Sequence, residues 1–230
     1  YNRMEPSIWG VNEEFISAPH LDDLQCAYSA LQGFLQGHNS KNINVMVCYD
    51  NEEVGSGTKQ GAGSTFLHDV LHRINTALGK PEEAYYRALA NSFMLSADNA
   101  HAVHPNHPEK TDATNCVYMN EGIVVKSHAG QKYTSDAVSI AIFRKICEEA
   151  GVPVQFFSNR SDMAGGSTLG NISSTKVAMN AVDIGLPQLA MHSSYETAGV
   201  KDTFYMVKAM EMFYRTTLSE VSEGAWNIDV

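Results

Sequence analysis

The sequence contains few cysteines, and none of them lie close together. Cys26, Cys48, Cys116 and Cys147 are far apart in the 230 residues, and the chain has no Cys-x-x-Cys pair. This spacing excludes a disulfide-dense secreted scaffold and is typical of the reduced thiols of an intracellular protein. We therefore expect a cytoplasmic protein whose cysteines serve mainly in packing.

Long hydrophobic runs and basic clusters are also missing. The longest apolar stretches, such as 137–143, are far too short to span a bilayer, and no charged segment followed by an apolar one opens the chain. The formal charge of -10 argues against nucleic acid or an anionic membrane as a partner. The chain starts at Tyr1 without a start-like segment, so we expect that an upstream part is missing.

The composition and the order of apolar segments predict a single α/β domain. A chain of 230 residues with 43% hydrophobic residues can bury one sizeable core. Apolar runs alternate with amphipathic segments, as in an α/β sandwich. We expect strands at 14–18, 43–49, 93–96, 122–126, 152–157, 177–184 and 187–191, and helices at about 24–36, 66–78, 136–151 and 201–218, with a short helix ending at Asn91.

Two adjacent glutamates follow the apolar run 43–49, where a buried strand is expected to end. Glu52 and Glu53 lie in the segment 50–56, DNEEVGS. Like charges at the end of a core strand are costly unless a cation or a proton compensates them. One carboxylate can bind a metal ion while its neighbour stays free to accept a proton from water. The pair therefore predicts a metal ligand beside a proton acceptor. The alternative is that both glutamates are simply solvated on a loop.

Further metal-ligand side chains follow other predicted strands. Asp22, Asp98 and His192 each come after an apolar segment, at the end of the strands where open α/β sheets bind ligands. A mixed set of carboxylates and histidine suits Zn, Co or Mn, and paired metals are usual in aminopeptidases and related hydrolases. Asp22 is equally placed to cap the helix that follows it.

Four motifs, taken in order and spacing, resemble the aspartyl aminopeptidase family of zinc metallopeptidases. They are Leu21-Asp22 and the segments 50–56, 96–106 (SADNAHAVHPN) and 187–193 (PQLAMHS). The resemblance runs from about Phe15 to Leu218. It implies a three-layer α/β/α sandwich with a mixed central sheet and a two-metal exopeptidase. Such enzymes remove N-terminal residues from peptides, typically Asp or Glu, although some members prefer neutral side chains.

The resemblance also implies roles for individual residues. Asp22 matches the aspartate that bridges two divalent ions, most often zinc. Glu53 and His192 match the ligands of one ion, and Asp98 matches a ligand of the other. Glu52 matches the general base, which would take a proton from water and return it to the leaving amine.

Three more residues match family positions that contact the substrate. These are His101, Lys126 and Tyr133, and Lys126 is suited to pair with an acidic substrate group or a developing oxyanion. Each has a simpler alternative: Lys126 as a solvated strand end, Tyr133 as a packing aromatic and His101 as a surface histidine.

Several other residues remain unassigned. His104 and His107 read equally well as surface histidines, and Asp162 is expected to order a turn rather than to bind metal. His20 precedes Asp22 in a His-x-Asp pattern but does not align with the family's metal-binding histidine.

The chain departs from the family in two respects. Family members take a further metal-binding histidine from an earlier strand and carry an inserted dimerisation domain, and neither is present in residues 1–230. We therefore expect a single, incomplete catalytic domain that lacks one or two strands of its sheet. The family also implies a homo-oligomer, typically a dodecamer. A catalytically silent subunit and a two-metal deacylase of the same broad fold remain as alternatives.

Overall fold

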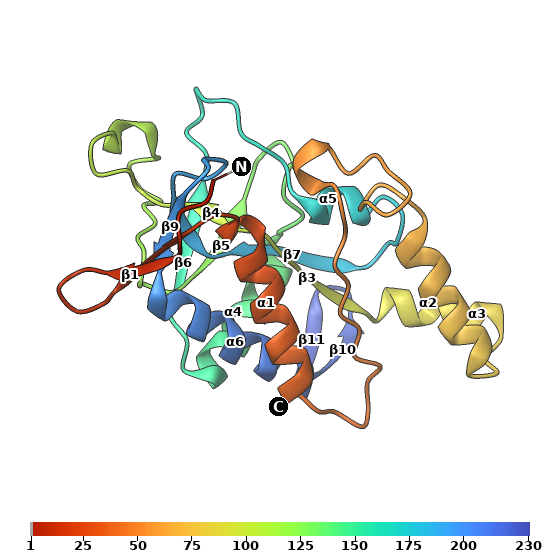
Figure 1. Ribbon diagram of the computed structural model, residues 1–230. Helices are drawn as coiled ribbons and strands as arrows, with labels where there is room; N and C mark the ends of the chain where they lie inside the picture. The colour runs from red at the N-terminus through yellow and green to blue at the C-terminus, as the bar shows by residue number, and fades with distance from the viewer. Residues whose placement is uncertain (1) are drawn as a thin grey trace.

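A computed structural model describes residues 2–230 and has mixed α and β structure (Figure 1). Each predicted segment except 43–49 overlaps a helix or strand of the structure, with bounds that differ by up to three residues. The strands are β1 (Ser7–Trp9), β2 (Phe15–Ala18), β3 (Phe93–Ala97), β4 (Ala100–His101), β5 (Ile123–Ser127), β6 (Val154–Ser158), β7 (Asn180–Gly185), β8 (Pro187–Leu189), β9 (Glu196–Gly199), β10 (Thr217–Ser222) and β11 (Ala225–Asp229). The helices are α1 (Leu21–Gln36), α2 (Phe66–Ala77), α3 (Glu82–Ala90), α4 (Ala137–Ala150), α5 (Leu169–Ser173) and α6 (Val200–Arg215), with 3-10 helices η1 (Glu52–Val54) and η2 (Pro108–Lys110).

A mixed four-stranded sheet forms the centre, in the order β3-β7-β5-β6. β3 runs parallel to β7 and β5 parallel to β6, whereas β5 and β7 are antiparallel. The central strands are buried on both faces, because Ile123 and Val125 of β5 belong to one core cluster and Val124 to another. Side chains alternate along a strand, so apolar layers cover both faces, and the predicted α/β sandwich is confirmed.

Helices α1, α4 and α6 pack beside one another on one face of this sheet (Figure 1). Their buried residues, including Cys26 of α1, Phe143 of α4 and Met206 of α6, join β5 and β7 in the largest core cluster. α4 begins as predicted: the Asp136 carboxylate accepts from the Ser139 N–H, and the Ser139 hydroxyl accepts from the Asp136 N–H. This capping box satisfies two amide groups that the first turn leaves free.

A second sheet of five short strands, in the order β1-β2-β9-β8-β4, lies next to the first. β2 and β9 pair antiparallel, and Ala18 opposite Glu196 is the last pair of their register. The chain enters the segment of Asp22 directly after β2, and the segment of His192 lies between β8 and β9. This sheet therefore brings two distant candidate residues to one place.

Several features of the structure were not expected from the sequence, among them strands β1, β4 and β9 and helix α5. The segment 43–49 has no strand pairing within the described residues, so the strand predicted there is wrong for this chain. The helical stripe Leu24, Tyr28, Leu31 and Leu35 of α1 is exposed, while Gln25, Cys26, Ser29 and Gly33 are buried instead. The β10–β11 hairpin was not expected from the sequence, and its first two residues fall within the range 201–218 that was predicted as helix.

None of the helices within residues 2–230 combines the length and the apolarity that crossing a bilayer requires.

Candidate metal centre and active site

Asp22 lies at the start of α1, where the backbone is not yet helical. Its φ and ψ are -83° and 114°, and the residue at the N-cap position is His20, with no side-chain capping bond. An N-cap side chain accepts from a backbone N–H of the first turn, and no backbone N–H within the described residues donates to the Asp22 carboxylate, so the alternative of Asp22 as a helix cap is wrong. The Asp22 side chain is only 4% exposed, and its Oδ1 has no hydrogen-bond partner among the described residues. A buried carboxylate oxygen without a partner is costly, so this position demands a cation or a proton.

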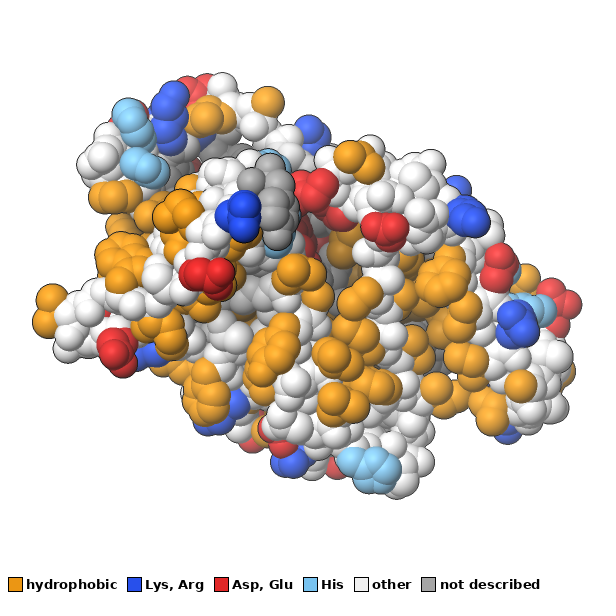
Figure 2. Space-filling view, viewed as in Figure 1, with side chains coloured by type: hydrophobic (Ala, Val, Ile, Leu, Met, Phe, Trp, Pro, Cys, Tyr) orange, Lys and Arg blue, Asp and Glu red, His pale blue; other side chains and the backbone are white. Residues whose placement is uncertain are grey.

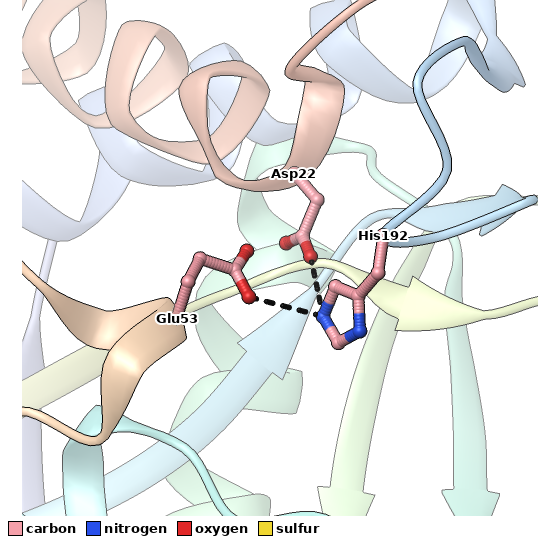
Figure 3. A group of neighbouring side chains, drawn as sticks. All are labelled: Asp22, Glu53 and His192. Atoms are coloured by element: carbon pink, nitrogen blue, oxygen red, sulfur yellow. Dashed lines mark ion pairs between the residues drawn. The ribbon is translucent and has the colours of Figure 1, made fainter.

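Glu53 and His192 meet Asp22 from two other segments (Figure 3). His192 Nε2 lies 3.3 Å from Asp22 Oδ2 and 3.2 Å from Glu53 Oε2. Glu53 comes from η1, and His192 comes from the turn after β8 with φ 65°. One ligand atom from each of the three residues lies within 4.8 Å of the others. The structure thus brings together three of the four predicted metal ligands.

Asp98, the fourth predicted ligand, also lies close to Asp22. Asp22, Asp23 and Asp98 form a second group with ligand atoms within 4.8 Å of one another. Asp22 belongs to both groups, which is the position a bridging carboxylate takes. Asp23 was not identified from the sequence, and its Oδ1 accepts from the Asn99 N–H at 3.1 Å.

The electrostatics of the two groups agree with cation binding. Burial raises the pKa of Asp22 to about 8, together with the neighbouring carboxylates of Asp98, Glu53 and Glu196. Asp23 has a raised pKa for the same reasons, with burial first and Asp98 next. Carboxylates gathered in the interior oppose ionisation unless a positive charge joins them. The donor set, with its unpaired Asp22 oxygen, therefore fits divalent metal ions of the zinc type.

Glu52 lies next to Glu53 but belongs to neither ligand group found among the described residues. Burial, with the charges of Asp98 and Glu53, raises the pKa of Glu52 to about 7, while Lys126 and His192 oppose the change. A carboxylate with a pKa near neutrality can both accept and release a proton. The adjacent glutamates thus have different surroundings.

Lys126 is buried beside Asp98. Its side chain is 3% exposed, and its Nζ lies 3.1 Å from Asp98 Oδ2 and donates to the Asn99 carbonyl at 2.7 Å. Burial lowers the pKa of Lys126, but the attraction of Asp98 and other negative groups outweighs burial, so the pKa is raised. The alternative of a solvated strand end is therefore wrong.

Tyr133 and His101 are placed near Lys126. Tyr133 is 6% exposed, and the Lys126 Nζ lies 5.6 Å from the centre of its ring. The pKa of His101 is lowered by partial desolvation of the ring and then by the charges of Lys126 and His192. Tyr133 belongs to a core cluster, so it packs in the core as its simpler alternative expected.

The unassigned residues lie on loops or directly before α1. His107 Nδ1 lies 3.2 Å from Glu109 Oε1, on an exposed loop. Asp162 accepts from Arg160 Nε at 2.9 Å within the same turn, in agreement with a turn-ordering role. His20 has φ 60° and precedes α1. None of these residues belongs to a metal-ligand group within the described part of the chain.

Two buried polar residues around the site were missed by the sequence analysis. Asn99 Nδ2 lies within 3.2 Å of the Leu21 carbonyl, Gln25 Oε1 and Gln188 Oε1, so it joins three segments. Glu196 accepts from the Asp22 N–H and the His192 N–H, both at 2.9 Å. An isolated glutamate four residues after His192 was the only sequence signal for Glu196.

With this geometry established, the chain can be placed among known proteins. The family model described as "Aminopeptidase I zinc metalloprotease (M18)" matches residues 1–214. The chain belongs to this family of metallopeptidases. It is 51% identical over 214 residues to "Probable M18 family aminopeptidase 2" of Clostridium novyi, covering 93% of this chain and 49% of that protein.

Solved structures agree with this assignment. The M18 family aminopeptidase of Thermotoga maritima superposes with a TM-score of 0.84 at 28% identity, covering 92% of this chain and 48% of that one. The mApe1 dodecamer of S. cerevisiae gives a TM-score of 0.81 at 29% identity, covering 94% and 49%. The chain thus spans about half the length of the relatives it matches.

Proposed function

We propose that this chain carries the metal site and catalytic base of an aminopeptidase that removes N-terminal Asp or Glu from peptides. The observation that carries the proposal is that Asp22 belongs to one group with Glu53 and His192 and to a second group with Asp98. Four separate segments supply these side chains. Membership of the metallopeptidase family supports the same activity.

The residues are arranged to hold two divalent ions, with zinc as the proposed metal. Asp22 would bridge, Glu53 and His192 would bind one ion, and Asp98 would bind the other. When bound, such ions polarise a scissile carbonyl and lower the pKa of water. Asp22, Asp98 and His192 follow strands β2, β3 and β8, whereas Glu53 lies in η1. Hydrogen bonds from the Asp22 and His192 N–H groups to Glu196 orient two of these segments.

Glu52 is proposed as the general base. Its raised pKa of about 7 lets its carboxylate take a proton from the attacking water at neutral pH and pass it to the leaving amine. A metal ligand is not free for this exchange, so the separation of Glu52 from both ligand groups supports the assignment.

Substrate contacts are proposed for His101, Lys126 and Tyr133. An acidic N-terminal side chain favours a nearby ammonium group, and Lys126 Nζ lies beside Asp98. A cation bound by Asp98 competes with Lys126 for the same carboxylate. The proposed preference for Asp or Glu over neutral residues rests on the buried ammonium group of Lys126.

We also propose that residues 1–230 form only part of a catalytic domain. A cleft of about 950 Å³ lies between β3, which is an edge strand, and the extended segment 43–49. Apolar side chains such as Leu24, Met46 and Leu71 line this cleft, and Glu52 and Glu53 lie at its margin. On the same side of the molecule hydrophobic side chains gather over α1 and toward α2 (Figure 2).

The proposed occupant of this cleft is an extended segment from the other half of a longer protein. A strand placed there would pair with β3, would give the segment 43–49 a partner, and would cover the apolar wall. Unpaired edges and apolar faces of this kind are otherwise sites of association. The support is the coverage of about half of each relative.

Assembly into a homo-oligomer and a cytoplasmic location are part of the same proposal. The S. cerevisiae relative is described as a dodecamer. The four cysteines are free in the structure, in keeping with a reducing compartment.

The test measures release of Asp from an Asp-initiated peptide, with a Leu-initiated peptide beside it, in the presence of Zn, Co or Mn. The chain is assayed alone and mixed with the part of the Clostridium novyi relative that it does not match. We expect cleavage in the mixture, with Asp preferred.

Glu52→Gln is the decisive variant in the same assay. We expect it to lower activity roughly 10²- to 10⁴-fold and to leave metal content unchanged. Metal binding with cleavage by neither the chain alone nor the mixture would instead favour a silent subunit or a deacylase.

A further inference from the structure

Glu196 connects the two segments that carry the candidate ligands of one ion. It is the first residue of β9 and is 2% exposed. Its Oε2 accepts from the Asp22 N–H at 2.9 Å, and its Oε1 accepts from the His192 N–H at 2.9 Å. Each oxygen of one carboxylate thus holds the backbone of a different ligand residue.

The location of Glu196 in the sheet explains how it reaches both segments. Ala18 opposite Glu196 is the last register pair between β2 and β9. Beyond this pair the ladder cannot restrain the chain, and Asp22 follows four residues after Ala18. The Glu196 side chain therefore continues the connection between these segments where the backbone pairing ends.

The backbone around the ligands requires such support. His192 has φ 65° and Ala190 has φ 58°, and His20 before Asp22 has φ 60°. Left-handed conformations of residues other than glycine are unfavourable by about 1 kcal/mol or more. The surrounding structure has to hold these turns, and the hydrogen bond from the His192 N–H to Glu196 closes one of them.

The choice of a carboxylate at this place is itself informative. Within residues 2–230 no Lys, Arg or His side chain forms an ion pair with Glu196, and it adds negative charge beside Asp22. Burying an unpaired charge near like charges is unfavourable for folding alone. A group that accepts from two N–H donors with two equivalent oxygens is, however, suited to hold both ligands at once.

We propose that Glu196 is a positioning residue that sets the spacing of Asp22 and His192 before metal binds. This inference rests on the proposed metal site. Neighbouring groups that orient ligands typically change metal affinity 10- to 100-fold when they are replaced.

Glu196→Gln tests the arrangement with almost no change in size. The amide keeps one acceptor oxygen but turns an NH₂ group toward the other N–H donor. We expect the zinc affinity of the chain, measured by competition with a chromogenic chelator, to fall about 10- to 100-fold. We also expect the visible absorption of bound Co²⁺ to change, because the placement of Asp22 and His192 around the ion is altered.

Glu196→Asp separates positioning from charge. It keeps the charge and both oxygens but is one methylene shorter, so it cannot reach both N–H groups. Positioning predicts weaker binding in this variant too, whereas a purely electrostatic role predicts wild-type affinity. Glu211→Gln, on α6, is the matched control and should leave the affinity unchanged. All chains are compared at a temperature at which circular dichroism shows them folded.

The outcomes distinguish the inference from the function on which it rests. Weaker binding and altered Co²⁺ absorption in both variants would support it. Wild-type affinity and an unchanged spectrum in Glu196→Gln, with zinc bound by the wild-type chain, would overturn the positioning role alone. No zinc or Co²⁺ binding by the wild-type chain would overturn the metal site and the inference together.

Discussion

His192 Nε2 lies 3.2 Å from Glu53 Oε2, and the same nitrogen lies 3.3 Å from a carboxylate oxygen of Asp22. An imidazole nitrogen carries at most one proton, so two carboxylates at that atom compete for a single hydrogen bond. A cation placed among the three groups interacts favourably with all of them. This relationship connects the geometry of the chain to its family, and its consequences can be measured.

Replacing His192 should abolish stabilisation by zinc. Zinc at 100 times its dissociation constant should raise the free energy of unfolding of the wild-type chain by about 2.7 kcal/mol. His192→Ala removes a ligand atom, so the same zinc concentration should produce little shift in the melting temperature. His107→Ala, on the exposed loop with Glu109, is the control and should respond like the wild type. Equal zinc-induced shifts in all three chains would contradict the ligand assignment.

Adding a methyl group at Gly185 should disturb the second ligand group. A Cβ atom there would lie 2.0 Å from the Asp98 carbonyl oxygen, and backbone cannot give way as a flexible side chain can. Gly185→Ala should therefore displace Asp98, lower the melting temperature and weaken zinc binding.

Gly166→Ala is the matched control for this substitution, because nothing lies within 4 Å of its added Cβ. We expect a stability change within about 0.5 kcal/mol for this exposed site. The assignment of Asp98 fails if Gly185→Ala destabilises the chain but leaves its zinc affinity intact.

Asp202 should make the stability of the chain depend on pH. Burial raises the pKa of this carboxyl to about 7 from its ordinary value of 3.8, although the N–H groups of Asn120 and Gly122 act in the opposite direction. The folded chain therefore holds this proton more tightly than the unfolded chain. The resulting stability is fully present below about pH 4 and is lost as the pH rises through 7. Between these two values the free energy of unfolding falls by about 1.4 kcal/mol for each pH unit.

Asp202→Asn removes this dependence. The amide of Asn does not titrate, so the stability that this position contributes in the variant is the same at every pH. Urea unfolding at several pH values between 5 and 8 should therefore show that the free energy of unfolding of the variant rises relative to that of the wild type as the pH increases. A difference that stays constant over this range would disprove the raised pKa.

The exposed face of α1 should tolerate polar residues. Leu31 and Leu35 are 42% and 67% exposed, so Leu31→Ser and Leu35→Ser together should change the free energy of unfolding by no more than about 1 kcal/mol. They should also reduce self-association in light scattering. Ile146→Ala, at a fully buried site of α4, should cost about 2–5 kcal/mol. A comparably large loss from the α1 substitutions would show that this face is already covered in the chain.

Local sequence patterns predicted most of the secondary structure correctly. The sequence predicted the start of α4 at Ser135-Asp136 and its end at Gly151, because helix capping involves only neighbouring residues. The sequence motifs also identified Asp22, Glu53, Asp98 and His192, which the structure brings together. Their functional roles remain a prediction.

The sequence by itself determined the residue types of the site and the alternation of strands and helices, since both follow from short-range pattern. Only the tertiary structure decided which face of α1 is buried, because that depends on the neighbours available to cover it. The segment 43–49 is apolar enough for a strand, yet a strand needs a partner for its hydrogen bonds, and none of the described residues provides one. Glu196 likewise acquires its position between Asp22 and His192 only when β2 and β9 pair.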